Sequence, residues 1–292
     1  MGLEEELTEI AGTYGGRGAP AVHPSRTDVV VVRRGEVVVK AHSERDDPDR
    51  LALRVRAAGA AALTGIMLPP LERKVLRVAG RALTVWPAGT PVSAEDAHAD
   101  PGSAPWEEGA RLLARLHAVP LTDVPRLPEA GGPGQAARAV RRMPGDGPLQ
   151  RLVRRAHSGI EVKEPAPALL THGDWHLGQL VRRERWLLID VDDLGVGDPA
   201  WDLARPAAWY AAGLLEPRIW ERFLGAYLAS GGPALGAGDP WARLDLPARA
   251  LTVQLAAVAV FNAARDGREL DEAEQSLIEA CGRIVGLRKS LQ

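Results

Sequence analysis

The sequence predicts an α+β protein of two lobes, a β-rich N-terminal lobe over residues 1–87 and a mainly helical C-terminal lobe over residues 88–292. Three observations support this prediction. Runs of β-branched residues are concentrated in the first ninety residues, apolar residues recur with helical spacing after them, and a Trp-Pro-Ala-Gly segment at 86–89 separates the two patterns as a hinge. A chain of 292 residues is long enough to fill two lobes.

The N-terminal lobe is predicted from short β-branched runs separated by turn residues. The segments DVVVVR and EVVVK flank Arg34-Gly35, which predicts a hairpin, and a second pair of strands surrounds Ala79-Gly80. A helix is expected between the two pairs, because Pro48 suits a first turn and Asp46 or Asp47 precedes it as a cap. The expected elements are strands over 28–33, 36–40, 71–78 and 81–85, and a helix over 48–62.

The C-terminal lobe is predicted from apolar residues with helical spacing. The segment ARLLARLHAV belongs to a helix that is expected to end before Pro120. Residues 127–147 are rich in Gly, Pro and Arg, and we expect a loop or a flexible insertion there, near the substrate. The expected elements are helices over 106–119, 204–213, 217–229, 247–265 and 270–287, and short strands over 168–170 and 186–191.

The composition limits the classes of partner. The formal net charge of −2 lacks the basic bias of a nucleic-acid-binding protein. Cys281 is the only cysteine, which excludes an internal disulfide and a cysteine-rich zinc module, and we expect its side chain to be buried. The N-terminal segment lacks the features of a signal peptide, and no stretch approaches the roughly 20 apolar residues of a membrane span. We therefore expect a cytoplasmic monomer or homodimer that binds neither nucleic acid nor membrane.

The densest cluster of polar residues is the segment HGDWHLGQ, residues 172–179. It lies between two short apolar runs and is therefore expected to be a loop between buried strands, where catalytic groups are often found. Asp190 follows eleven residues after Gln179, at the end of the second apolar run, and begins the segment DVDDLGVGDPAWDLA.

These two segments resemble the aminoglycoside phosphotransferase and choline kinase family, relatives of the protein kinases. The family pattern is HGDxxxxN followed by a strand that ends in IDxDxxxxGDPxxDLA, and residues 189–204 match its second part completely. The resemblance extends to Lys40, the hinge and the ARLLARLHAV helix, so it covers most of the chain. The HGDxHLGQ form of the loop is similar to that of maltokinase-like members.

The resemblance implies a bilobal protein-kinase-like fold and the transfer of a phosphoryl group from ATP, or alternatively GTP, to a hydroxyl of a small molecule with Mg²⁺. Asp174 would be the catalytic base, and Asp190, Gln179 and Asp192 would be metal ligands. Lys40, Trp86 and Ala88 would bind the nucleotide. His172, Asp198 and Asp202 would support the site.

Two departures from the family pattern bear on the nucleotide site. The family pairs its strand lysine with a Glu on the following helix, but here Arg54 occupies that place, so Glu44, Asp46 or Asp47 could substitute, or Lys40 could be held by phosphate alone. No P-loop motif is present. We expect the nucleotide loop before Thr27, around residues 23–26.

Three alternatives stay open from the sequence. His172, Asp174 and His176 form an HxDxH pattern that could bind zinc for hydrolysis. The departures at Arg54 and Gln179 are also compatible with a nucleotide-binding pseudokinase. Among acceptors, the sequence does not choose between an aminoglycoside or other antibiotic and a sugar-like metabolite.

Overall fold

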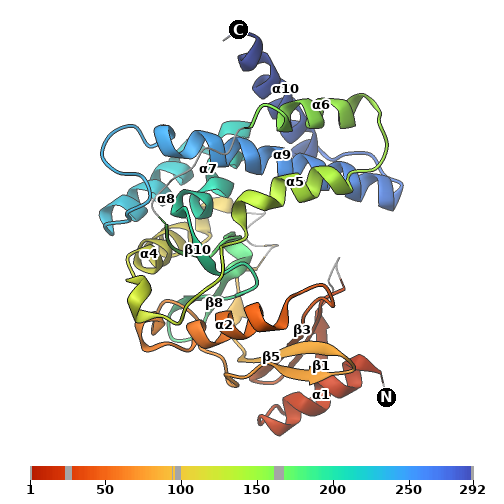
Figure 1. Ribbon diagram of the computed structural model, residues 1–292, viewed down its shortest axis with the longest axis vertical. Coiled ribbons are helices and arrows are strands. Elements are labelled where there is room, and N and C mark those ends of the chain that lie inside the picture. The colour runs from red at the N-terminus through yellow and green to blue at the C-terminus, as the bar shows by residue number, and fades with distance from the viewer. Residues whose placement is uncertain (1, 24–27, 94, 96–99, 161–167, 291–292) are drawn as a thin grey trace.

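The computed structural model describes residues 2–23, 28–93, 95, 100–160 and 168–290. It has a β-rich N-terminal lobe and a helical C-terminal lobe, which lie at opposite ends of the molecule (Figure 1). The α+β, two-lobed architecture predicted from the sequence is therefore confirmed.

An antiparallel five-stranded sheet forms the N-terminal lobe, in the order β1-β2-β3-β5-β4. The strands are β1 (Pro20–His23), β2 (Val30–Arg34), β3 (Val37–Ala41), β4 (Leu76–Val78) and β5 (Arg81–Pro87). The predicted hairpin turns at Gly35, whose φ of 57° favours glycine. Strand β4 is shorter than expected, because only Leu76–Val78 pair with β5.

The alternation of side chains along β3 decides which face carries Lys40. Val37, Val39 and Ala41 are buried against helix α1 (Leu3–Thr13), which the sequence analysis did not predict and which covers one face of the sheet. Because successive side chains point to opposite faces, Lys40 is directed to the other face. That face looks toward the C-terminal lobe.

Helix α2 (Pro48–Ala58) follows β3 as predicted. Asp47 caps it by accepting hydrogen bonds from the backbone N–H groups of Asp49 and Arg50, and Pro48 occupies the first turn. The helix ends earlier than expected, and residues 61–63 form a separate 3-10 turn, η1 (Ala61–Leu63).

The chain passes between the lobes after β5. The hinge predicted over residues 86–89 is shorter than expected, because Trp86 and Pro87 still pair with β3 and the strand ends at Pro87. The crossing is at 88–89, before β6 (Thr90–Pro91) pairs with β8 (Leu180–Arg182) in the C-terminal lobe. A side chain at Gly89 would meet Val181 at 2.8 Å, so this crossing requires glycine.

Two small sheets and a set of helices form the C-terminal lobe. The sheets are β6-β8-β9, with β9 at Trp186–Leu188, and β10-β7, with β10 at Gly195–Gly197 and β7 at Leu169–Thr171. The helices are α4 (Trp106–His117), α5 (Gly132–Arg142), α6 (Pro148–His157), α7 (Ala204–Ala212), α8 (Pro217–Ala229), α9 (Trp241–Asp266) and α10 (Glu272–Ser290). Short 3-10 turns are η2 (Pro101–Ser103), η3 (Leu121–Asp123), η4 (Leu177–Gln179) and η5 (Pro199–Leu203).

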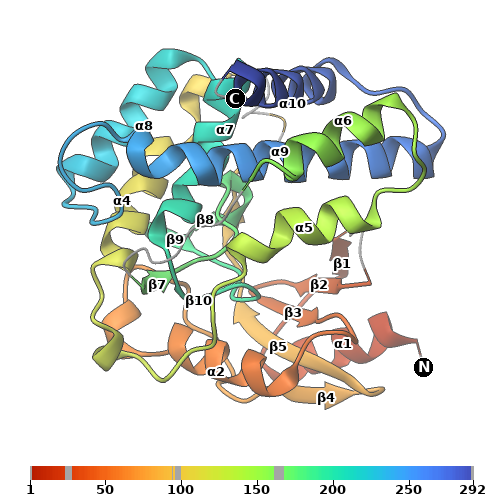
Figure 2. The same ribbon diagram turned by 45° about the horizontal axis from the view of Figure 1, so that its top comes forward.

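The expectation of a loop over residues 127–147 is wrong. Helix α5 occupies most of this segment, with Ala136 and Val140 buried, and it packs on α9. In both views α5 lies between α9 and the N-terminal lobe (Figures 1 and 2). The segment is thus largely helical, and it contacts the residues that follow Asp190 through Gln135 and Asp193.

Helix α9 is the central helix of the C-terminal lobe. It begins at Trp241, earlier than expected, so Pro247 lies inside it. By length and composition alone α9 could cross a membrane, but 61% of its most apolar window is buried within the protein. The core helix of a globular protein, which is mostly buried, meets the same criteria of length and composition. The prediction for Cys281 is confirmed, because its side chain is fully buried against α9 and its neighbours.

Candidate active site

The two sequence motifs meet at one junction. Residues 172–179 connect β7 to β8, and Asp190 follows β9, the next strand of the same small sheet. The backbone N–H of Ile189 donates to the carbonyl oxygen of Gln179 at 2.9 Å, and His172 Nε2 lies 2.8 Å from the carbonyl oxygen of Ile189. The end of the loop and the start of the aspartate segment are therefore fixed side by side.

Asp202 anchors the loop of residues 172–179 through hydrogen bonds to its backbone. One carboxylate oxygen accepts from the backbone N–H of His172 at 2.6 Å and the other from that of Gly173 at 2.7 Å. His117 Nε2, whose ring also contacts the Tyr227 hydroxyl, lies 2.9 Å from the same carboxylate. Burial would raise the pKa of Asp202, but these hydrogen bonds, first among them the one from His117, outweigh it and lower the pKa.

His172 and Asp198 contact the backbone of neighbouring segments, as expected of residues that support the site. His172 bridges the loop to Ile189, as described above. Asp198 caps η5 through the backbone N–H of Ala200 at 3.0 Å and forms an ion pair with Arg243 at 2.8 Å.

Asp174 points out of this anchored loop and is one-third exposed. Its Oδ1 atom forms an ion pair at 2.8 Å with Arg205, whose side chain is mostly buried. The sequence analysis missed Arg205, although it directly follows the DLA end of the recognised motif. An arginine held in this way fixes the direction of the Asp174 carboxylate.

Lys40 joins the two lobes at the aspartate segment. Its ammonium group lies 2.9 Å from Asp190 Oδ1 and 2.8 Å from Asp192 Oδ2. Burial alone would lower the pKa of Lys40, but the two carboxylates outweigh it and raise the pKa. The pKa of Asp192 is lowered in turn, because Lys40 and then His42 outweigh the effect of burial.

Asp190 has a backbone conformation that fits a functional position. Its φ of 66° is in the left-handed region, which non-glycine residues adopt at a cost, typically at sites where the surroundings impose it. The Gln179 amide nitrogen donates to Asp190 Oδ2 at 3.3 Å, so the Gln179 amide oxygen is the atom that this side chain would offer to a cation. Carboxylate and amide oxygens at one point are the donors that Mg²⁺ prefers, and the residues fit such an ion.

Asp193 is a further acidic residue at the junction that the sequence analysis did not single out. Its side chain accepts from Gln135 of α5 at 3.1 Å. Burial and the nearby Asp174 carboxylate raise the pKa of Asp193 to about 6. The chain thus places a second carboxyl near Asp174.

Arg54 does not face Lys40. Its Nε donates to the carbonyl oxygen of Leu194 at 2.8 Å, so it braces the segment that follows the aspartates. The substitution of the missing helix Glu by Glu44, Asp46 or Asp47 is also wrong: Asp47 caps α2, Asp46 accepts from the backbone N–H of Ser43, and Lys40 pairs with Asp190 and Asp192.

The expected hinge residues lie at the end of strand β5, close to Lys40 of β3. The Trp86 indole N–H donates to the Thr84 hydroxyl at 2.8 Å, and the backbone N–H of Ala88 donates to the carbonyl oxygen of Glu36 at 2.8 Å. The expected nucleotide loop at 23–26 lies outside the described residues, except for His23, which ends β1.

The HxDxH pattern does not form a metal site among the described residues. His176 Nδ1 accepts from the backbone N–H of Gly178, and His172 contacts Ile189. Asp174 pairs with Arg205 instead. In the part of the chain that the structure describes, the group of metal-ligating side chains that converges is His42, Asp46 and Asp192.

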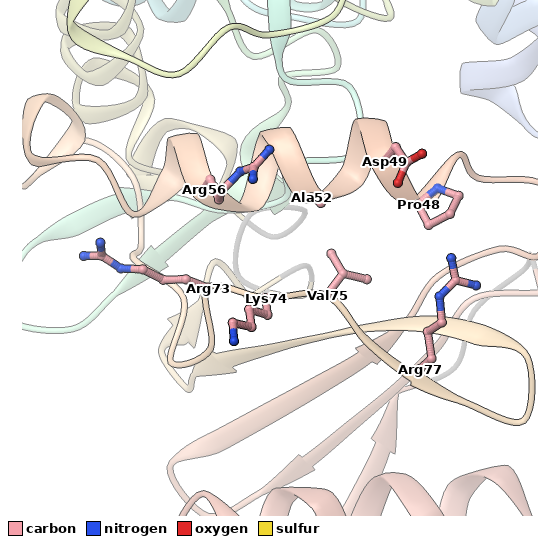
Figure 3. Close-up of a pocket in the computed structure, with 8 residues that line it drawn as sticks. All are labelled: Pro48, Asp49, Ala52, Arg56, Arg73, Lys74, Val75 and Arg77. Atoms are coloured by element: carbon pink, nitrogen blue, oxygen red, sulfur yellow. The ribbon is translucent and has the colours of Figure 1, made fainter.

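Two cavities lie away from this junction. One, of about 220 Å³, is lined by α2 and residues 73–77, and a larger one, of about 770 Å³, lies between residues 58–69 and 183–187. Figure 3 shows Arg77 of the first cavity pointing toward the start of α2, whereas Arg73 and Lys74 extend in other directions. The basic side chains therefore do not converge on one point, as an anion site would require.

His176 gives this loop a pH dependence. Burial and then the Arg205 guanidinium lower the pKa of His176 from 6.5 to about 4. The unfolded chain therefore binds a proton between pH 6.5 and about 4 that the folded chain excludes, so this residue makes stability fall as the pH drops through that range. His176→Asn retains an acceptor for Gly178 and does not titrate. Urea denaturation at pH 6.5 and pH 4 should show a smaller loss for His176→Asn than for wild type, and equal losses would contradict the account.

Comparisons with known proteins identify the family. A family model described as the phosphotransferase enzyme family (APH) matches residues 23–245. A search of curated proteins found no match.

Solved structures share the fold over almost the whole chain. A choline/ethanolamine kinase family protein from Mesorhizobium loti has a TM-score of 0.64 at 19% identity, over 98% of this chain and 93% of that one. A thermostable mutant of aminoglycoside phosphotransferase APH(4)-Ia, in a complex with AMP-PNP and hygromycin B, has a TM-score of 0.63 at 16% identity, over 98% of both chains. The choline kinase LicA from Streptococcus pneumoniae has a TM-score of 0.59 at 13% identity, over 98% of this chain and 99% of that one.

The protein therefore has the fold of small-molecule kinases, related to that of protein kinases. The family model covers most of the chain, so the chain belongs to the phosphotransferase enzyme family and is a small-molecule phosphotransferase. The resemblance inferred from the HGD and IDxD segments is confirmed.

Proposed function

We propose that the protein transfers the γ-phosphate of ATP, or of GTP as the alternative donor, to a hydroxyl group of a small molecule. The observation that carries this proposal is the convergence of Lys40, Gln179 and Asp190 at the junction between the lobes, with Gln179 on the loop that also carries Asp174. Asp174, Gln179 and Asp190 come from the two motif segments of the C-terminal lobe, and Lys40 reaches Asp190 from the N-terminal lobe at 2.9 Å.

Asp174 is the base in this proposal. Its carboxylate is one-third exposed, and Arg205 holds one of its oxygens at 2.8 Å. The other oxygen can accept the proton of an acceptor hydroxyl while it holds that hydroxyl in line with the phosphate. The fixed loop beneath it, anchored on Asp202, keeps this geometry without rearrangement during the reaction.

Lys40 and the oxygen donors serve the nucleotide. Asp190 and Gln179 would hold Mg²⁺, and the bound ion would neutralise the phosphate charge. The expected metal role of Asp192 is set aside, because its two oxygens face Lys40 and His42. Lys40 is kept protonated by its two carboxylate partners, so it can pair with the phosphates as a full positive charge. Trp86 and Ala88 lie at the end of strand β5, where a nucleotide base would reach the crossing between the lobes.

The acceptor is proposed as a hydroxylated antibiotic or a sugar-like metabolite. Proteins of the same fold include an aminoglycoside phosphotransferase bound to hygromycin B and a spectinomycin phosphotransferase, besides the choline kinases. The residues around Asp174 in this chain include Asp193, with Gln135 and Gln254 behind it in a row of hydrogen bonds. Carboxylate and amide groups of this kind suit an acceptor with several hydroxyls.

An acceptor screen tests the proposal. Purified protein with Mg²⁺ and ATP is incubated with aminoglycosides, other antibiotics, sugars and amino alcohols, and ADP release is measured against an acceptor-free control. We expect release above the control with at least one class, and none when EDTA removes Mg²⁺. Nucleotide binding without transfer to any acceptor would instead favour the pseudokinase alternative.

A further inference from the structure

Four polar or aromatic side chains lie on the face of the N-terminal sheet that carries Lys40. Lys40 pairs with Thr84 across β3 and β5, and the backbone N–H of His42 donates to the carbonyl oxygen of Ala82, which continues the same register. Residues two apart on a strand share a face, so Lys40, His42, Thr84 and Trp86 all point toward the aspartate segment.

Two hydrogen bonds connect Trp86, Thr84 and His42, and His42 also approaches Asp192. The Trp86 indole N–H donates to the Thr84 hydroxyl at 2.8 Å, and the Thr84 hydroxyl lies 2.8 Å from His42 Nε2. On the other side of the ring, His42 Nδ1 lies 3.1 Å from Asp192 Oδ1. His42 and Thr84 are almost completely buried, so their polar atoms have little access to water.

Donor and acceptor rules fix the tautomer of His42. The Trp86 indole N–H can only donate, so it uses the Thr84 oxygen as its acceptor. Among the described residues, the acceptor within reach of the buried Thr84 O–H is His42 Nε2. Nε2 is then the acceptor nitrogen of a neutral ring, and the proton lies on Nδ1. This atom lies 3.1 Å from Asp192 Oδ1, and among the described residues neither of these two buried atoms has another hydrogen-bond partner.

Asp192 is thereby held by both of its oxygens. Oδ1 faces His42 at 3.1 Å and Oδ2 faces Lys40 at 2.8 Å. The backbone N–H of Asp192 also donates to Asp190 Oδ1 at 3.2 Å. Within the described residues, Lys40 forms ion pairs with Asp190 and Asp192 and with no acidic side chain of α2. Arg54 of α2 donates to the carbonyl oxygen of Leu194 instead.

We propose that His42 is a positioning residue: it holds Asp192, and Asp192 in turn orients Lys40 toward the nucleotide phosphates. His42 and Asp192 together then replace an acidic residue on the helix as the partner of Lys40. This inference rests on the proposed function. It assigns Asp192 to Lys40 and His42 rather than to a second metal ion. It also connects Trp86 to Lys40 through Thr84, His42 and Asp192.

A metal ion on His42, Asp46 and Asp192 is the competing arrangement, since their ligand atoms lie within 4.8 Å of one another. It would need a deprotonated Nδ1 and an Asp192 released from His42. The tautomer therefore separates the two arrangements directly.

The first test needs no nucleotide. In ¹⁵N-histidine NMR spectra of the whole protein, the signals that disappear in His42→Asn belong to His42. We expect the tautomer protonated on Nδ1, unchanged by EDTA. A ring protonated on Nε2, or a Nδ1 signal that shifts when EDTA removes a metal, would overturn the proposal.

The second test is a double-mutant cycle on the affinity for Mg²⁺ with AMP-PNP, measured by calorimetry. His42→Leu removes the donor to Asp192 and should weaken binding about tenfold. His42→Asn can place an amide N–H where Nδ1 stands and should restore most of the affinity. In an Asp192→Ala background, His42→Leu should have no further effect, because the residue acts through Asp192.

The proposal would be overturned if the losses of affinity caused by His42→Leu and Asp192→Ala multiply in the double variant. It would also be overturned if His42→Asn does not restore the affinity, or if His42→Leu leaves the affinity unchanged. Thermal unfolding of each variant accompanies the titrations, because a purely structural role would lower the melting temperature of His42→Leu equally in both backgrounds. If wild type itself does not bind nucleotide, the proposed function fails, while the NMR test still decides the hydrogen-bonded arrangement.

Discussion

Asp174→Asn should lower phosphoryl transfer by a factor of about 10²–10⁴, the usual contribution of general acid–base catalysis. The substitution retains the size of the side chain and a hydrogen-bond acceptor for Arg205, but it removes the group that takes up the proton of the hydroxyl. The nucleotide contacts lie on Lys40 and Asp190, so the affinity for AMP-PNP with Mg²⁺ should change little. Initial rates with an identified acceptor, and calorimetry, measure the two quantities.

Asp193→Asn is the matched control for this variant. It neutralises the neighbouring carboxyl, whose pKa of about 6 would otherwise make it a rival base near neutral pH. The Asn side chain can still accept from Gln135. We expect Asp193→Asn to retain transfer within about tenfold of wild type, and a loss as large as that of Asp174→Asn would move the assignment of the base to Asp193.

Asp202→Asn should lower the free energy of unfolding by about 3–5 kcal/mol, the cost of breaking a buried charged pair. Asp202 is 1% exposed and accepts hydrogen bonds on both oxygens, from the backbone of His172 and Gly173 and from His117. An amide group has only one acceptor oxygen, so its NH₂ would face a donor in the interior. The loop that carries Asp174 should lose its fixed shape together with this stability.

Asp198→Asn is the control from the same segment of the motif. Asn caps a helical turn as well as Asp does, so the contact with Ala200 persists. The ion pair with Arg243 is partly exposed, and its loss should cost no more than about 1 kcal/mol. Urea denaturation compares the variants, and a similar loss in both would contradict the anchoring role of Asp202.

Much of the fold follows from local patterns in the sequence. The β-branched runs, the turn at Gly35 and the cap at Asp47 are signals of neighbouring residues, and they predict β2, β3 and α2 well. The HGD and IDxD segments predict that Asp174 and Asp190 lie in the same part of the C-terminal lobe, because each segment follows a short apolar strand, β7 or β9.

Helix α5 was missed because its first residues suggest a loop. Gly131 and Gly132 are needed for close packing: a Cβ at Gly131 would lie 1.7 Å from Asp193 Oδ1, and one at Gly132 would lie 3.1 Å from Trp201. The glycines therefore reflect contacts with residues distant in sequence. Such contacts have no local signature, since a glycine in a flexible loop looks the same in the sequence.

The partners of the charged residues were also beyond the sequence. Arg54 bonds to a carbonyl oxygen 140 residues away, and Lys40 pairs with Asp190 and Asp192, 150 and 152 residues away. Any of several acids near Lys40 in the sequence fitted the family pattern equally well. Only the register of β3 and β5 and the position of β9 decide between them.

The account depends most on the claim that the junction of Asp190, Gln179 and Lys40 binds a nucleotide with Mg²⁺. The most direct measurement is calorimetric titration of AMP-PNP into wild type and Asp190→Asn, each with Mg²⁺ and with EDTA. Asn tolerates the left-handed conformation of residue 190, so this variant removes the charge without straining the backbone. We predict binding by wild type that requires Mg²⁺ and is at least about tenfold weaker in Asp190→Asn. Binding that is indifferent to Mg²⁺ and to the substitution would contradict the account.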